Sequence, residues 1–94
     1  MIYISGGITG VKNFAAHFAR AEKQLTEQGW DVVNPAKINT NLPPACTHED
    51  YMKVSMAELS LCDTIYMLKG YEKSKGAMEE LRYAAGNGYT IIKE

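Results

Sequence analysis

The sequence contains no long run of apolar residues, although 46% of its 94 residues are hydrophobic. A helix that spans a membrane needs about 18 consecutive apolar residues, and the amino terminus lacks the basic and apolar regions of a signal peptide. We therefore expect a cytoplasmic protein with no membrane segment. A chain of this length and hydrophobic content suffices for one core, so residues 1–94 are expected to form a single domain.

An excess of charge of one sign is also missing. The 10 basic and 11 acidic residues give a formal net charge of -1, and neither sign forms a long run. Without a broad electrostatic field, duplex nucleic acid and anionic membranes are not favoured as partners. A small or locally charged ligand fits this composition better.

Cysteine is scarce, and no metal-ligand spacing is present. Cys46 and Cys62 do not form a CxxC motif, and a reducing compartment is expected to keep both as thiols. His17 and His48 have no partner ligands at a useful spacing in the sequence. We therefore expect neither a metal site nor a bound cofactor.

Hydrophobic periodicity predicts an alternation of strands and helices. Strands are expected at residues 2–5, at "WDVVNP" (30–35), at "DTIYML" (63–68) and at "YTIIK" (89–93). Helices are expected from Asn13 to the stop at Gly29, from the capping-box-like Thr47 to about Leu61, and from Ala77 to Ala85, with loops at 38–44 and 70–76. This order favours a three-layer α/β fold, flavodoxin-like or Rossmann-like, with a parallel sheet in strand order 2-1-3-4 and helices on both faces.

In such a sheet, ligands bind beyond the carboxyl ends of the strands, where the strand order reverses. The rule selects "SGGITG", "NP" and "KGYEKSKG". Glycines allow the backbone to approach a ligand closely, and the hydroxyls stand ahead of a helix whose free amides favour anions. A plain strand-to-helix turn remains open as the alternative for "SGGITG", and an ordinary N-cap serine remains open for Ser74. The candidate binding residues are Ser5, Gly6, Gly7, Ile8, Thr9, Asn34, Ser74 and Gly76.

Two adjacent glutamates at the start of the last predicted helix have different surroundings. At roughly 100° per residue, Glu80 lies at the border of the buried stripe and Glu79 lies nearly opposite, in solvent. A carboxylate beside an apolar wall at the mouth of a crevice has the setting of a nucleophile or a general base. A role in stabilising the helix dipole stays open as the alternative. The predicted buried stripe consists of Ala77, Leu81, Ala84 and Ala85.

The segments "YISGGITG", "NPAKIN" and "CDTIYMLKGYEKSKGAMEELRYAAGNG" together resemble the nucleoside 2-deoxyribosyltransferase-like superfamily, in particular its small phage and bacterial branch. The resemblance covers nearly the whole chain. Its most specific part places "ELRYA" where the family has "ELGYA", which implies that Glu80 is the nucleophile. The implied reaction is attack on C1′ of a 2-deoxyribonucleoside to give a glycosyl-enzyme ester, which a second base or water resolves with retention of configuration.

The resemblance also implies roles for other residues. Tyr3 matches a tyrosine that positions the glutamate. Ser74 stands where related nucleotide N-hydrolases have a phosphate-contacting serine, which favours a 5′-monophosphate substrate. The loop expected to hold that phosphate consists of Gly6, Gly7, Ile8 and Thr9.

One position departs from the family pattern. The acidic residue that helps to protonate or orient the base lies eight residues before the strand aspartate in the family, and counting back from Asp63 gives Ser55. A hydroxyl does not replace a carboxylic acid as proton donor, so either the base departs slowly or another group, such as Asp50 or a water molecule, takes this role.

From these observations we expect a deoxyribosyltransferase or a deoxynucleoside 5′-monophosphate N-glycosidase, with a small deoxynucleoside or deoxynucleotide as its partner. A nucleotide-binding or sensing module that keeps the pocket without turnover is the competing hypothesis, and an interaction domain is the third. Since family members commonly assemble, and small domains gain stability from assembly, we also expect a homo-oligomer. Base preference and the choice between transfer and hydrolysis stay open at this stage.

Overall fold

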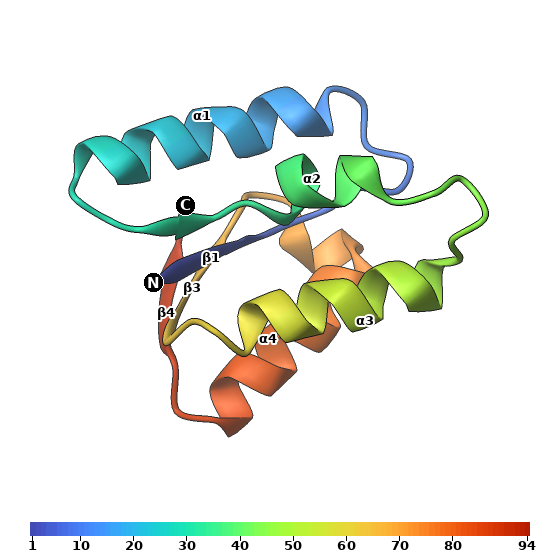
Figure 1. The fold of residues 1–94 in the computed structure, drawn as a ribbon. Coiled ribbons are helices and arrows are strands. Elements are labelled where there is room, and N and C mark those ends of the chain that lie inside the picture. Colours follow the sequence, from blue (N-terminus) through green and yellow to red (C-terminus); the bar gives the residue numbers. More distant parts are fainter.

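A four-stranded parallel sheet forms the centre of the computed structural model, which describes all of residues 1–94 (Figure 1). The strands lie in the order β2-β1-β3-β4, so the predicted α/β class and strand order are confirmed. The strands are β1 (Ile2–Ser5), β2 (Val32–Val33), β3 (Thr64–Met67) and β4 (Thr90–Lys93). The helices are α1 (Phe14–Glu27), α2 (Pro35–Ile38), α3 (His48–Leu59) and α4 (Lys75–Gly86), with 3-10 turns η1 (Asn39–Asn41) and η2 (Tyr71–Lys73).

Helices cover both faces of the sheet and make three layers. Figure 1 shows α1 on one face and α3 with α4 on the other. Because side chains alternate along a strand, Ile2 and Ile4 of β1 pack toward Phe18 of α1, whereas Tyr3 belongs to the second core with Leu59 and Ala77. Burying a side chain such as that of Phe18 contributes about 1.5–3 kcal/mol to folding. The alternation of side chains along β1 therefore decides which of them face α4.

Short polar side chains fix where two helices begin. The Thr47 hydroxyl accepts a hydrogen bond from the Asp50 amide (3.2 Å), and the Asp50 carboxylate accepts one from the Thr47 amide (2.9 Å). This is the predicted capping box of α3. Ser74 caps α4 in the same way, because its hydroxyl accepts a hydrogen bond from the Ala77 amide (3.1 Å).

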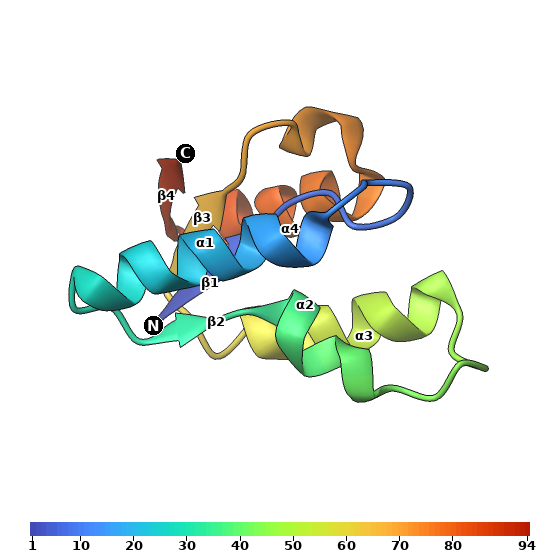
Figure 2. The same cartoon turned by 90° about the horizontal axis from the view of Figure 1, so that it is seen from above.

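The segment after β2 differs from the sequence prediction. Instead of a strand over 30–35 and a loop over 38–44, the strand has two residues and the chain turns at once into α2 and η1. Asn34 causes this turn: its side chain accepts a hydrogen bond from the Lys37 amide, and Pro35 occupies the first helical position, where its fixed φ and missing N–H are tolerated. The result is a wall of helical turns beside the carboxyl end of the sheet (Figure 2).

Two other helix boundaries also shift. Helix α3 ends at Leu59, two residues before the expected end near Leu61. Helix α4 begins at Lys75 rather than Ala77, because Ser74 is its N-cap, and the expected loop at 70–76 contains η2. No helix in the structure has the length and apolar character that a membrane crossing requires.

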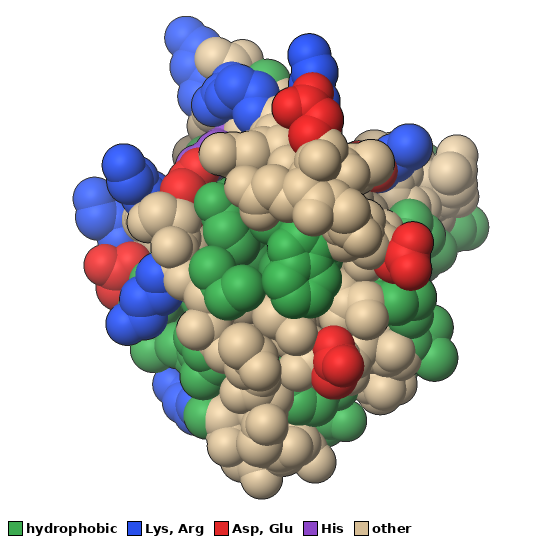
Figure 3. Space-filling view, turned by 90° about the vertical axis from the view of Figure 1, so that its left-hand side faces the viewer, with side chains coloured by type: hydrophobic (Ala, Val, Ile, Leu, Met, Phe, Trp, Pro, Cys, Tyr) green, Lys and Arg blue, Asp and Glu red, His purple; other side chains and the backbone are tan.

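Hydrophobic side chains gather at the end of the molecule where the strands begin. Figure 3 views this end and shows an apolar group at its centre, with charged side chains around it. Met1, which precedes β1, is 46% exposed, and Leu61, which precedes β3, is 68% exposed. This end lies opposite the carboxyl ends of the strands.

Gly6 allows the chain after β1 to lie directly against the residue that follows β3. A Cβ atom at Gly6 would lie 2.9 Å from Cβ of the buried Leu68, a distance that neither backbone accommodates without moving. We expect Gly6→Ala to lower the free energy of unfolding by about 1–3 kcal/mol, measured by urea denaturation.

Gly86 offers the matched control, because a Cβ atom there meets no heavy atom within 4 Å and its φ is not in the left-handed region. Gly86→Ala should leave stability unchanged or raise it by up to about 1 kcal/mol. If the two substitutions changed the free energy of unfolding equally, the contact with Leu68 would not be what requires glycine at position 6.

Candidate active site

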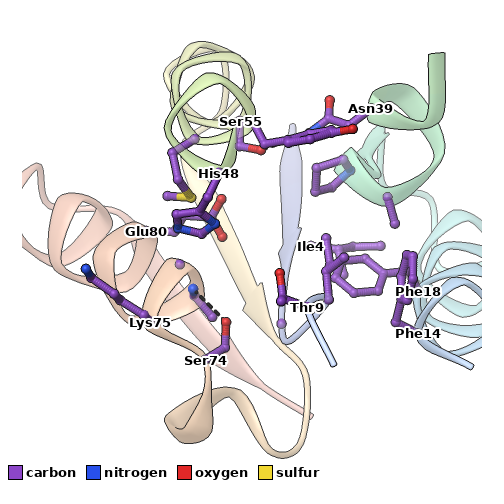
Figure 4. A pocket seen from close by; sticks show the side chains of 18 of the residues that line it. Ile4, Thr9, Phe14, Phe18, Asn39, His48, Ser55, Ser74, Lys75 and Glu80 are labelled. Carbon is purple, nitrogen blue, oxygen red and sulfur yellow. Dashed lines mark hydrogen bonds between the residues drawn. The ribbon is translucent and has the colours of Figure 1, made fainter. Parts of the chain in front are cut away.

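A cavity of about 620 Å³ opens beyond the carboxyl end of β1. The strand order reverses between β1 and β3, because the chain runs from β1 to β2 on one side and continues to β3 and β4 on the other. In open parallel sheets, ligands bind beyond the carboxyl ends of the strands at this point, and the cavity lies there. Its walls come from β1 and the loop after it, α1, α2, η1, α3 and the start of α4 (Figure 4). The volume falls within the range of about 300–1,000 Å³ that is typical of small-molecule sites.

Glu80 lies on the wall of this cavity and is held by two hydroxyl groups. Tyr3 donates a hydrogen bond from Oη to Oε2 of Glu80 (2.6 Å), and Ser5 donates one from Oγ to Oε1 (2.6 Å). Tyr3 and Ser5 are two residues apart on one strand, so both side chains face α4. Each carboxylate oxygen therefore has one short hydrogen bond, which fixes the orientation of the group.

The burial of Glu80 gives its carboxyl group an unusual pKa. The residue is 6% exposed, and no lysine, arginine or histidine forms an ion pair with it. Removal from water raises its pKa from 4.5 to about 7, against the opposing effect of the hydrogen bonds from Ser5 and Tyr3. Burial also raises the pKa of Tyr3, so its phenol keeps the proton that it donates. Glu80 thus changes charge close to neutral pH.

The helical face that carries Glu80 differs in detail from the predicted stripe. Ala77, Glu80 and Ala84 are buried, whereas Leu81 is half-buried and Ala85 is exposed. Glu80 therefore lies at the centre of the buried face and not at its border, because the small alanines on either side let α4 approach β1. Glu79 is half-buried, so the expectation that it lies in open solvent was too strong.

Ser55 lies at the back of the cavity with a partner that the sequence did not indicate. Asn39 of η1 donates a hydrogen bond from Nδ2 to Oγ of Ser55 (2.9 Å), and both residues are 7% exposed. Ser55 also lowers the pKa of the Tyr3 phenol, against the larger effect of burial. Asn39 and Ser55 form one hydrogen-bonded pair in the cavity, and Tyr3 and Glu80 belong to another.

At the other end of the cavity, the loop after β1 meets the start of α4. A Cβ atom at Gly7 would lie 3.7 Å from Cβ of Ser74, which brings the two predicted anion-binding segments together. Ser74 and Thr9 both line the cavity, and Figure 4 shows them near each other. Lys73 and Lys75 add two positive charges to this end, which sequence reasoning did not select.

The remaining walls are largely apolar and close around the centre. Figure 4 shows Phe14, Phe18 and Ile4 on the side opposite Glu80 and His48. Gly76 allows α3 to lie close to α4, because a Cβ atom there would lie 3.1 Å from Sδ of Met52. Sequence reasoning missed these lining residues because they come from positions that it assigned to core stripes or to a loop.

The structure brings most of the predicted site residues together, but four have other places. Ser5 does not line the cavity, because its side chain points to Glu80. Asn34 caps α2 and donates to Glu22 (3.0 Å), and Gly7 lies behind the lining. Asp50 does not line the cavity either, and the hydrogen bond from the Thr47 amide holds its pKa below the usual value. The cavity wall contains the predicted residues Tyr3, Gly6, Ile8, Thr9, Ser55, Ser74, Gly76 and Glu80.

Comparison with known proteins yields one family. A family model described as a domain of unknown function, DUF4406, matches residues 1–93. No curated protein and no solved structure matches the chain.

The raised pKa of Glu80 has a consequence for stability. The carboxyl group has a higher pKa in the folded chain than in the unfolded chain, so its contribution to stability is fully present below about pH 4.5 and is lost as the pH rises through about 7. We expect Glu80→Gln to raise the free energy of unfolding at pH 8.5, by up to about 3 kcal/mol, and to change it little at pH 4.5.

Urea denaturation at the two pH values measures this difference. Glu79→Gln is the matched control: it removes a neighbouring charge that contributes least to the raised pKa of Glu80, so it should change stability much less at both pH values. A destabilising effect of Glu80→Gln at pH 8.5 would contradict the assignment of a buried, unpaired carboxylate.

Proposed function

The chain belongs to the DUF4406 family, whose description names no activity, and we propose from the site itself that the protein is an N-glycosidase or transferase acting on deoxynucleoside 5′-monophosphates. One observation carries the proposal: a carboxylate, oriented by two hydroxyls and charged near neutral pH, lies on the wall of a cavity large enough for a nucleotide. The resemblance of "SKGAMEELRYA" to the deoxyribosyltransferases independently selects the same carboxylate.

Glu80 is the nucleophile of the proposed reaction. One of its oxygens attacks C1′ of the deoxyribose, the bond between C1′ and the base nitrogen breaks, and the electron pair of that bond leaves with the base. The base takes a proton from water, because Ser55 is not an acid and Asp50 caps α3 outside the cavity. Water or a second base then displaces the ester oxygen from C1′ and restores Glu80, with retention of configuration.

Tyr3 and Ser5 are positioning residues for this step. Each donates its hydrogen bond to a different oxygen of Glu80, so the carboxylate cannot rotate away from the cavity. Because one hydrogen bond leaves lone pairs free on each oxygen, the carboxylate still presents an electron pair to C1′. Fixed orientation of this kind lowers the entropic part of the barrier.

The end formed by the loop after β1 and the start of α4 is the proposed phosphate site. Gly6, Ile8 and Thr9 bring backbone and a hydroxyl to this end, and the first amides of α4 favour an anion. Lys73 and Lys75 supply positive charge beside Ser74. These features favour a 5′-monophosphate over a nucleoside as the substrate.

A binding or sensing module is the second candidate function, and the serine at position 55 favours it. Without an acid to protonate the base, the pocket would hold the nucleotide without releasing the base. In that case the ligand raises the melting temperature of the protein, and no free base accumulates.

We also propose a cytoplasmic location and a homo-oligomeric state. Both cysteines are free thiols, which fits a reducing compartment. The end of the molecule where the strands begin carries an apolar group (Figure 3), and it offers a surface for self-association.

The catalytic proposal predicts release of base from at least one member of a panel of deoxynucleosides and their 5′-monophosphates. Glu80→Ala should lower the rate by about a thousandfold or more, because it removes the nucleophile, whereas Glu79→Gln should stay within about twofold of the unmodified protein. Chromatography of the free base measures both rates. Failure of the unmodified protein to release base from any member, at high enzyme concentration, would eliminate the catalytic proposal.

The dependence of this rate on pH follows from the pKa of Glu80. Only the carboxylate form attacks C1′, so kcat/KM should rise about tenfold per pH unit below about 7 and level off above it. A profile that already levels off at pH 5 would show that Glu80 is not the titrating group.

Ser74→Asp tests the phosphate site without removing the helix cap, since aspartate is as good an N-cap as serine. The added negative charge should raise KM for 5′-monophosphates at least about tenfold and leave the rate with nucleosides nearly unchanged, because only the former carry a phosphate at this end. Ser74→Asn is the uncharged control, and steady-state kinetics with both substrate forms measure the effect. An equal rise of KM for both forms would place the phosphate elsewhere.

A further inference from the structure

Glu58 is a second buried acid, and the proposed reaction does not use it. It lies on α3, one turn after Ser55, and both of its carboxyl oxygens are buried without a hydrogen-bond partner. No lysine, arginine or histidine forms an ion pair with it. Because nearly all buried polar groups in folded proteins have a partner, an acid in this state is uncommon and costs stability.

The position of Glu58 is near the proposed nucleophile but outside the cavity. Helices α3 and α4 lie on the same face of the sheet and contact each other (Figure 1), and Leu59, the next residue along α3, packs in the same core as Tyr3. The negative charge of Glu58 raises the pKa of Tyr3 and that of Glu80, so Glu58 lies close enough to act on both. Since Glu58 does not line the cavity, it can affect a ligand there only through other residues.

No ion pair compensates either acid. On β1, the neutral hydroxyls of Tyr3 and Ser5 hold Glu80. On α4 itself, Glu79 is a further negative charge, but it raises the pKa of Glu80 less than Glu58 does. The other ionisable groups nearby are Cys62 close to Glu58 and, along the cavity, His48, Tyr51, Lys73 and Lys75, and none of them forms an ion pair with either acid.

Two negative charges in one protein interior oppose each other's formation. The interior screens charges less than water does, so their repulsion acts over a longer distance there. Burial already raises the pKa of both Glu58 and Glu80. Once one acid has ionised, the other keeps its proton to a higher pH, and the two titrate as a coupled pair.

We propose that Glu58 is a positioning residue for the nucleophile, whose charge opposes the ionisation of Glu80 and so sets the pH at which the reaction begins. The repulsion between the two acids needs no substrate, whereas its effect on the rate rests on the proposed function. Loss of the charge at position 58 lets Glu80 become a carboxylate at a lower pH. The unpaired state of Glu58 is then a property of the site, because a cationic partner would cancel the repulsion.

The ionisation of Glu80 is measured by NMR, from the ¹³C chemical shift of its carboxyl group as the pH is varied, with Glu80→Gln to assign the signal. In Glu58→Gln, the midpoint should fall by at least about half a pH unit. Glu58→Leu also removes the unpaired oxygens and should lower the midpoint in the same way, so the test does not depend on one variant. Glu58→Asp keeps the charge and should stay closer to the unmodified protein than to Glu58→Gln.

Glu49→Gln is the control, because Glu49 is an exposed acid in the first turn of the same helix. It should leave the midpoint of Glu80 unchanged. An unchanged midpoint in both Glu58→Gln and Glu58→Leu would overturn the inference. An equal fall in Glu49→Gln would overturn it as well, since the effect would then come from net charge and not from a buried neighbour.

A double-mutant cycle tests the same repulsion through stability. The free energy of unfolding is measured by urea denaturation for Glu58→Gln, for Glu80→Gln and for the protein with both substitutions. At pH 8.5, the double substitution should stabilise less than the sum of the two single ones, because either change alone already removes the repulsion. At pH 4.5, where both acids hold their protons, the effects should add. Additive effects at both pH values would contradict the coupling.

The rate of base release distinguishes this inference from the proposed function. If Glu80 is the nucleophile, the rise of kcat/KM with pH should move in Glu58→Gln by as much as the titration of Glu80 does. A titration that moves without base release from any deoxynucleotide, or with an unmoved rate profile, would support the coupling and contradict the role of Glu80 as nucleophile. A titration that stays in place, with base release that requires Glu80, would overturn the role of Glu58 and leave the proposed function intact.

Discussion

The arrangement of the whole site depends on one buried carboxylate that two hydroxyls of the first strand hold in place. The hydrogen bonds from Tyr3 and Ser5 connect α4 to β1, residues 77 and 75 positions apart in the chain. No cation compensates the charge of Glu80, so folding brings an acid into a setting where its pKa rises to about 7. A chain selected for stability alone has no need of such a group. A buried acid without a cationic partner, on the wall of a cavity, marks this cavity as the candidate functional site.

Close packing around this carboxylate requires small residues at particular positions. Ala77 and Ala84 flank Glu80 on the buried face of α4 and let the helix approach the sheet. Gly76 leaves room for Met52 of α3, and Gly6 leaves room for Leu68 after β3. These residues resemble ordinary turn and helix residues in the sequence. In the structure, they set the separation between Glu80 and the walls of the cavity.

How far the sequence predicts this protein depends on the range of the interactions involved. Strand order, the caps at Thr47 and Ser74 and the sheltered position of Glu80 follow from local periodicity, from spacing and from topological rules, so they could be predicted. The contact of Ser5 with Glu80 could not be predicted, because its partner lies on a distant helix and loop hydroxyls equally suit a ligand. Asn39 was missed because "NPAKIN" was taken to end a strand and enter a loop, whereas Asn34 caps a helical turn that lines the cavity.

The serine at position 55 changes meaning once its contacts are known. An ionised carboxylate there would be a second acceptor beside Tyr3, which has a single proton to donate, and its charge would raise the pKa of Glu80 above 7. A hydroxyl accepts the hydrogen bond from Asn39 without adding charge to this part of the cavity. In the proposed reaction, the loss of an acid at this position is thus coupled to a nucleophile that ionises near neutral pH. Protonation of the departing base then depends on water.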